Sequence, residues 1–144
     1  MPVSSPEYLA ELFRQMAFIA AVLGGFSAAF LATVVTAANS SRYATIAIGA
    51  AAFASASFVA VTVGATVVAL NVVALGLSDL AAFPAATDRA RFWTGLLFLV
   101  GIYALILALG MSGWLRSRAT GWTTTAAAVL AAIGATVALA AAAG

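Results

Sequence analysis

The long apolar stretches of this sequence contain hydroxyl and carboxamide side chains that could bind an ion or a small molecule. These candidate polar positions are Ser27, Thr33 and Thr36 in the first stretch and Thr62, Thr66 and Asn71 in the second. Serine and threonine can bond a carbonyl of their own helix, so they cost little in an apolar environment. A carboxamide cannot satisfy itself in that way. We therefore expect Asn71 to bond another helix, with a wet cavity or the headgroup region as alternatives.

No aspartate, glutamate, lysine, arginine or histidine falls inside the spanning parts of the four apolar stretches, the first of which runs from about Ala17 to Thr36. Ionisable groups within a bilayer are the usual mark of proton relays and ion pathways, so proton-coupled transport has no candidate residue here. Several charged residues gather at one predicted end of the helices and could ring the mouth of a path. Solvated helix ends are the simpler interpretation of this group, which comprises Glu7, Glu11, Asp79, Asp88, Arg89 and Arg91.

The composition excludes an ordinary water-soluble domain. Hydrophobic residues make up 65% of the 144 positions and charged residues only 7%, with a mean hydropathy of +1.16. Soluble domains carry about 25% charged residues, so lipid must be the solvent for most of this chain. The absence of cysteine and histidine removes thiolate and imidazole chemistry. We therefore expect no catalytic site, metal or cofactor, and the scattered arginines predict no nucleic-acid partner.

Four apolar stretches predict four transmembrane helices, at about residues 6–38, 43–77, 89–111 and 122–142. We expect one all-α, integral membrane four-helix bundle over residues 1–144, with up-down topology and both termini on the same side. The first helix follows two acids without a basic leader, so it should be retained rather than cleaved as a signal peptide. Thr87 or Asp88 can cap the third helix. The second helix should project from the bilayer, with a bend between Asn71 and Gly76 as the alternative.

Three tryptophans mark the predicted boundaries of the hydrocarbon. Trp93, Trp114 and Trp122 are predicted interface anchors, because tryptophan favours the headgroup level of a bilayer. Trp93 and Trp114 would lie about 31 Å apart along one helix, close to the thickness of the hydrocarbon core.

The distribution of charge and the composition bear on the orientation and on the kind of membrane. Three of the six arginines fall on each side of the predicted topology, so the positive-inside rule does not decide between the two orientations. All four acids lie with the N-terminus, which favours the opposite side as cytoplasmic. Abundant alanine, glycine and arginine without lysine indicate a GC-rich bacterial genome, and hence a bacterial inner membrane.

Small residues recur every four positions along the first two predicted helices. The predicted helix-packing positions are Gly24, Gly25, Ala28 and Ala32 in the first helix and Ala52, Ala56, Ala60 and Gly64 in the second. In lipid there is no hydrophobic attraction between helices, and small residues instead let two backbones approach closely. Packing within one bundle is the simpler interpretation, and packing between subunits is the alternative.

The hydropathy plan, with a polar turn before the first helix and a long second helix, resembles that of the Orai calcium channels. The segment Leu23–Phe26, LGGF, opens a small-residue run and is similar to part of their pore helix. The resemblance implies a four-helix channel architecture. Calcium selectivity is not implied, since that family uses an acid on the pore helix and no acid lies here between Glu11 and Asp79. Only Arg14 stands where that family has a basic segment, so no functional residue transfers.

These observations favour a small, non-enzymatic integral membrane protein that acts through helix packing. Its expected partners are the lipid bilayer and either further copies of itself or other membrane subunits, for which it would be a structural or accessory component. One alternative is an oligomeric channel with a hydroxyl-lined path along the first helix, past Ser27, Thr33 and Thr36. A second is a transporter of a small neutral solute, with Asn71 and neighbouring threonines as its contacts.

Overall fold

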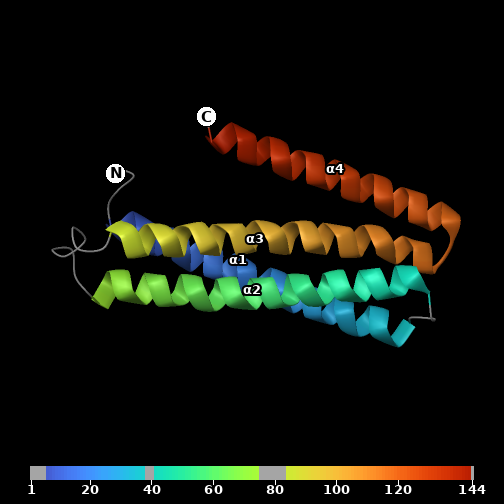
Figure 1. The fold of residues 1–144 in the computed structure, drawn as a ribbon, viewed down its shortest axis with the longest axis horizontal. Helices are drawn as coiled ribbons and strands as arrows, with labels where there is room; N and C mark the ends of the chain where they lie inside the picture. The colour runs from blue at the N-terminus through green and yellow to red at the C-terminus, as the bar shows by residue number, and fades with distance from the viewer. Residues whose placement is uncertain (1–5, 38–40, 75–83, 144) are drawn as a thin grey trace. The chain divides into compact units, whose positions relative to one another are not determined.

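The computed structural model describes residues 6–37, 41–74 and 84–143, and every regular element in these ranges is helical. In chain order they are α1 (Pro6–Ala37), α2 (Arg42–Ala74), α3 (Pro84–Ser112), the 3-10 turn η2 (Gly113–Leu115) and α4 (Arg118–Ala143), shown in Figure 1. Four of these helices are long and apolar enough to cross a membrane. The predicted all-α class is therefore confirmed for the described residues.

The helices begin where the backbone N–H groups of their first turns find acceptors. Ser41 precedes α2, and its Oγ accepts a hydrogen bond from the Ala44 N–H at 3.2 Å. Ser117 does the same for α4, accepting from the Thr120 N–H at 3.1 Å. Each serine thus satisfies one of the four N–H groups that a helix leaves unpaired at its start. Because of this cap, α4 begins at Arg118, and its predicted start at Trp122 is wrong.

The third helix also begins earlier than predicted. α3 begins at Pro84 rather than Arg89, so residues 84–88 are helical and the predicted cap at Thr87 or Asp88 is wrong. Proline suits the first position of a helix, because its fixed φ is helical and its missing N–H would have had no partner there. The alternative of a bend between Asn71 and Gly76 lies partly outside the described residues, and α2 continues without a break through Ala74.

Contacts divide the chain into two compact units, and α1, α2 and α3 each contribute a segment to both. Unit 1 comprises residues 1–25 and 55–100, and unit 2 comprises residues 26–54 and 101–144. The expectation of a single domain over residues 1–144 therefore stays a prediction.

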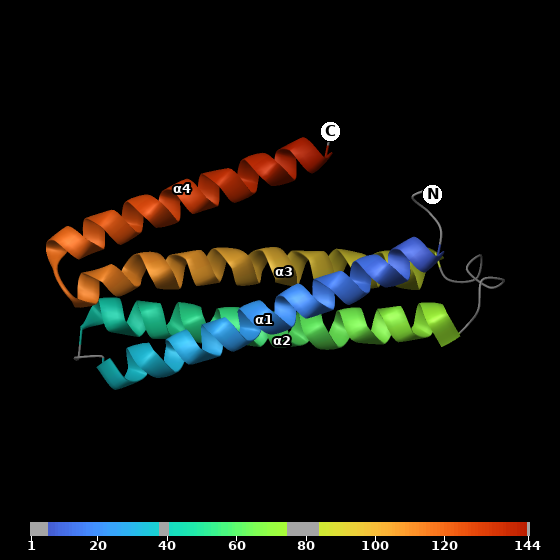
Figure 2. The same ribbon diagram turned by 180° about the vertical axis from the view of Figure 1, so that it is seen from behind.

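Unit 1 is built from close contacts between segments of α1, α2 and α3. Phe13 and Ala17 of α1 form a buried cluster with Ala65 and Ala69 of α2. Figure 2 shows the α1 segment of this unit in front of its α2 and α3 segments. Gly24 of α1 lies against Phe58 of α2. Earlier residues of α1, Phe13 and Ala17, contact residues of α2 that come after Phe58. The two segments therefore run antiparallel.

Segments of α2 and α3 meet in unit 1 through an aromatic pair. The rings of Phe58 and Phe98 lie edge to face with their centroids 6.0 Å apart. This geometry is favoured because the positive edge of one ring meets the negative face of the other. Phe58 is fully buried, so it anchors the unit between its three helical segments.

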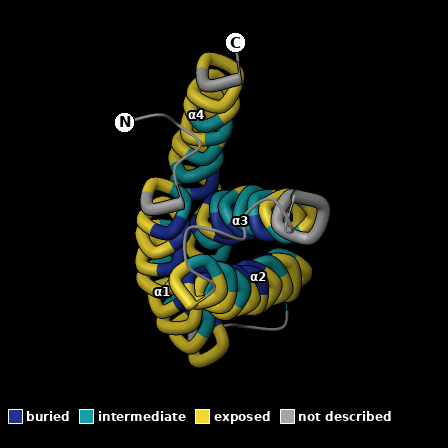
Figure 3. The backbone as a smooth tube through the Cα atoms, turned by 90° about the vertical axis from the view of Figure 1, so that its left-hand side faces the viewer, coloured by how far each residue is buried: buried dark blue, intermediate teal, exposed yellow. Residues whose placement is uncertain are grey.

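The buried residues of α1 and α2 recur at spacings of three or four, with one gap of seven on α1. Figure 3 colours the backbone by burial and shows buried and exposed parts along both helices. On α1 the buried row comprises Ala10, Phe13, Ala17, Ala20, Gly24, Ser27 and Val34. On α2 it comprises Ala44, Ala47, Ala51, Ala54, Phe58, Val61, Ala65 and Ala69, with Ser57 beside it. This spacing is typical of helices that pack at about 20° with interlocking side chains. Alanine fills most of the α2 row, which allows close backbone approach.

Enlarging a buried alanine of α2 should destabilise the protein. We expect Ala65→Leu to lower the free energy of unfolding by about 1–3 kcal/mol, because the side chain lies within the cluster around Phe13. Val67→Leu serves as the control, since Val67 is exposed on the same helix. Unfolding with a denaturing detergent measures both variants. Equal stabilities for the two leucine variants would contradict the buried row.

Candidate functional site

The turn from α3 into α4 is closely packed. Neighbouring atoms of the turn and its two helices come close to the backbone at three glycines. A Cβ added to Gly110 would lie 2.9 Å from the Ala128 Cβ, and one added to Gly121 would lie 2.5 Å from the Trp114 ring. A Cβ on Gly113 would collide with the Thr124 side chain. Side chains larger than hydrogen do not fit at these positions without movement of the neighbouring helix.

Hydrogen bonds fix the same turn. The Thr124 hydroxyl lies 3.0 Å from the Gly110 carbonyl oxygen on α3 and 3.0 Å from the Thr120 carbonyl oxygen on α4. The Trp114 indole N–H donates to the Thr125 hydroxyl at 3.0 Å. The turn therefore joins the two helices by polar contacts as well as by shape.

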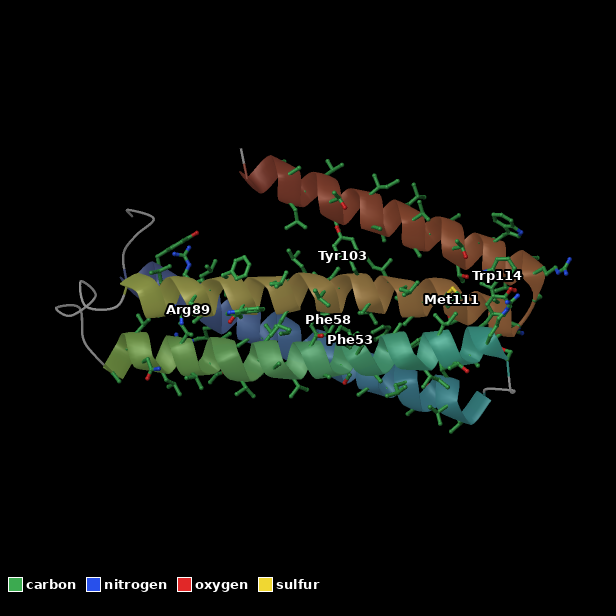
Figure 4. All side chains as sticks on the ribbon, viewed as in Figure 1. Phe53, Phe58, Arg89, Tyr103, Met111 and Trp114 are labelled. Carbon is green, nitrogen blue, oxygen red and sulfur yellow. The ribbon has the colours of Figure 1, made fainter. Side chains whose placement is uncertain are left out.

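A second polar contact joins α3 and α4 farther from the turn. The Tyr103 and Thr136 hydroxyl oxygens lie 2.7 Å apart, and Figure 4 shows Tyr103 pointing from α3 toward α4. Thr136 already donates its one hydroxyl proton to the Ala132 carbonyl at 2.8 Å. Tyr103 is therefore the donor in the interhelical bond. Residues 122–141 of α4 are otherwise at most half-buried.

The predicted helix-packing positions divide between buried and exposed sites. Gly24 is buried, and a Cβ there would lie 3.3 Å from the Phe58 Cβ. Gly64 is half-buried, and a Cβ there would lie 3.5 Å from the Thr94 hydroxyl. The remaining six are exposed within this chain: Gly25, Ala28, Ala32, Ala52, Ala56 and Ala60.

The exposed small residues of α1 continue into a single surface. We define the small-residue face of α1 as Gly25, Ala28, Ala29, Ala32, Thr33 and Thr36, all of which are exposed. Their spacing of three and four places them on one side of the helix. A Cβ at Gly25 would meet no atom within 4 Å among the described residues.

The candidate polar positions mostly bond their own helices. Thr33 and Thr36 donate to carbonyls of α1, and Thr62 and Thr66 donate to carbonyls of α2, at 2.7–3.1 Å. Ser27 is fully buried within the chain. Asn71 is exposed, and its carboxamide makes no hydrogen bond to another described residue. The predicted partner of Asn71 on another helix is thus not found within the described chain.

The predicted interface anchors belong to two different environments. Trp93 and Trp122 are exposed, whereas Trp114 is half-buried. The Trp114 ring stacks on Tyr43 at the start of α2, with centroids 5.6 Å apart, and it also contacts Trp122 at 6.0 Å. The guanidinium of Arg42 lies 5.6 Å from the centre of the Tyr43 ring. These residues form a continuous chain of contacts at one end of unit 2.

The charged candidates at the start of α1 make a solvated local contact. Arg14 and Glu11 form an exposed ion pair at 3.4 Å, and Gln15 donates to the same carboxylate at 3.2 Å. Such exposed pairs contribute little to stability. No group of acidic residues in the described part of the chain has the arrangement of a metal site. The side chains of Glu7, Asp79 and Asp88 lie outside the described residues.

The contacts that join α3 to α4 were not predicted from the sequence. Tyr103 and Thr136 were recognisable as polar residues in apolar stretches, but their pairing depends on how two helices align. Gly110, Gly113 and Gly121 flank the turn, and that clustering is the signal that could have indicated close packing there.

The chain matches no protein-family model, no curated protein and no solved structure. The hydropathy-level resemblance to the Orai channels is therefore not accompanied by a match to any solved chain. Interpretation of the α3–α4 contacts and of the small-residue face rests on the residues and distances above.

Glycine substitutions should have opposite effects at packed and open positions. Gly110→Ala should lower the free energy of unfolding by about 1–3 kcal/mol, because its new Cβ would collide with Ala128. Gly134→Ala should raise it by about 0.5–1 kcal/mol, since that position is open and alanine is the better helix former. Detergent unfolding measures both. A stabilising Gly110→Ala would show that the two helices do not approach at this point.

The Tyr103–Thr136 hydrogen bond should contribute a small, measurable coupling energy. A double-mutant cycle of Tyr103→Phe and Thr136→Val should give about 0.6 kcal/mol, the average for hydrogen bonds between membrane helices. The same cycle between Tyr103→Phe and Thr66→Val should give none, because Thr66 bonds the Thr62 carbonyl on α2. Additive effects of the first pair would argue against the contact.

Proposed function

We propose that this protein is a small, non-enzymatic integral membrane subunit that acts by packing its helices against further copies of itself or against other membrane proteins. The observation that carries the proposal is the small-residue face of α1, from Gly25 to Thr36, which is exposed in the single chain. Lipid tails can pack against large side chains as well as against small ones. A face of small residues gains most when another backbone approaches it.

The exposed large residues support this division of surfaces. On α4 the most exposed large side chains are Trp122, Leu130 and Val137, at 62–70% exposure. On α2, Ala52, Ala56 and Ala60 form a second exposed row of small residues. Large side chains suit contact with lipid, whereas the small rows of α1 and α2 suit contact with a neighbouring helix.

Membrane insertion is supported by the four long apolar helices. We propose an up-down arrangement with both termini on the same side, as consecutive antiparallel crossings require. The antiparallel contacts of α1 with α2 in unit 1, and of α3 with α4 in unit 2, are consistent with it. A bacterial inner membrane remains the proposed location, on composition alone.

The hydroxyl groups favour packing over a conducting path. Thr33 and Thr36, which would line a path along α1, direct their hydroxyl protons to carbonyls of α1 itself. Ser27, the third residue of that path, is buried within the chain. Ion flux into vesicles that contain the folded protein would favour the channel over the packing subunit.

Cysteine cross-linking tests the proposed contact surface, and the native chain has no cysteine to give background. In native membranes, Ala32→Cys should form a covalent adduct on mild oxidation or with a short bis-maleimide. An adduct of twice the chain mass would identify a second copy, and any other mass would identify a different subunit. The expected adduct follows from the position of Ala32 on the exposed small-residue face.

Two control positions make the cross-linking result specific. Ala20→Cys is buried within the chain and Leu130→Cys is 70% exposed on the surface assigned to lipid, so neither should form an adduct. The proposal fails if Ala28→Cys, Ala29→Cys and Ala32→Cys all react with maleimide yet none forms an adduct. A stable monomer without a retained partner in mild detergent would point the same way.

A further inference from the structure

All the ionisable side chains of unit 2 that carry charge are arginines. Residues 26–54 and 101–144 contain Arg42, Arg116 and Arg118, and they contain no aspartate or glutamate. Unit 1 holds the other three arginines together with all four acids, so formal side-chain charge is +3 in unit 2 and −1 in unit 1. No carboxylate side chain of unit 2 can therefore neutralise its arginines.

The three arginines lie beside a chain of aromatic rings. We call this surface the arginine collar: Arg42, Tyr43, Trp114, Arg116, Arg118 and Trp122. Arg42 contacts Tyr43, Tyr43 stacks on Trp114, and Trp114 contacts Trp122. Arg116 and Arg118 lie between the two tryptophans in the chain, and all three guanidinium groups belong to exposed residues. The collar thus combines three exposed arginines with a chain of contacting aromatic rings.

The arrangement leaves the arginine N–H groups available. The Arg42 Cζ lies 5.6 Å from the centre of the Tyr43 ring, and no hydrogen bond joins the guanidinium groups of Arg42, Arg116 and Arg118 to another described residue. The Trp114 indole N–H is already bonded to Thr125, which holds the base of the collar in place. Guanidinium groups bind phosphate oxygens in pairs, through two parallel hydrogen bonds.

The helix starts add to the positive potential of the collar. α2 begins at Arg42 and α4 begins at Arg118, so two helix N-termini contribute their partial positive charges at the same contact cluster. An anion that approaches the collar would therefore meet three full charges and two helix dipoles, with tryptophan rings that favour the headgroup level of a bilayer.

We propose that the arginine collar binds the anionic phospholipid headgroups of one leaflet. Basic residues near an anionic membrane surface each strengthen binding by about 5-fold, and the anionic leaflet is the cytoplasmic one. The collar would then lie on the cytoplasmic side, which agrees with the side favoured by the distribution of acids. This inference rests on the proposed membrane insertion and is independent of the proposed assembly through the small-residue face.

Lipid competition in reconstituted membranes tests the proposal. The full chain is placed in phosphatidylcholine nanodiscs with increasing phosphatidylglycerol, and bound lipids are counted by native mass spectrometry after mild extraction. The native chain should retain phosphatidylglycerol in preference to phosphatidylcholine. The double variant Arg116→Gln/Arg118→Gln should lose about 25-fold of that preference, as two contributions of about 5-fold multiply.

A matched variant separates a specific surface from general attraction. Arg89→Gln/Arg91→Gln removes the same charge from exposed residues of unit 1, and it should retain the native preference. Equal losses in the two double variants, or no preference in the native chain, would overturn the proposal. Alkaline extraction and far-ultraviolet circular dichroism report insertion and helicity, and Ala32→Cys cross-linking reports assembly. Failure of the lipid surface can therefore be distinguished from failure of the proposed function.

Discussion

The described helices depend on close backbone approach, because in the proposed membrane they would have no hydrophobic attraction for one another. Alanine and glycine occupy most of the positions where helices meet, from Ala65 beside Phe13 in unit 1 to Gly110 beside Ala128 in unit 2. Dispersion contacts are individually weak and fall off steeply with distance, so such packing succeeds only where side chains are short. Phe58 is one exception, and it fits because Gly24 leaves room for it.

Polar groups follow a matching constraint, since a hydrogen-bonding atom without a partner is costly in an apolar solvent. Most threonines of α1 and α2 satisfy themselves within one turn. The α3–α4 pair differs, because Thr124 and Tyr103 reach across to the neighbouring helix. No buried side-chain nitrogen or oxygen in the described part of the chain lacks a partner. Polar contacts therefore specify the position of α4, which buries little apolar surface of its own.

The sequence predicted the helices better than it predicted their contacts. Long uncharged stretches determine that a segment is helical in lipid, and this property is local. The start of α4 was predicted wrongly because the Ser117 cap stands outside the apolar stretch. The buried row of α2 could not be predicted for a different reason. Ala51 is buried and Ala52 is exposed, so residue type does not distinguish the buried face of the helix from the exposed one. Tyr103 and Thr136 are 33 positions apart, and only the alignment of two helices pairs them.

In the proposed membrane, the length of α2 has a consequence for the surrounding bilayer. From Tyr43 to Ala74 the helix carries no charge and would extend about 48 Å, against about 30 Å of hydrocarbon. Such hydrophobic mismatch strains the surrounding lipid by fractions of a kcal/mol for each ångström. A thick bilayer would cover more of α2 than a thin one. Membrane thickness would then act on this protein as a sorting signal.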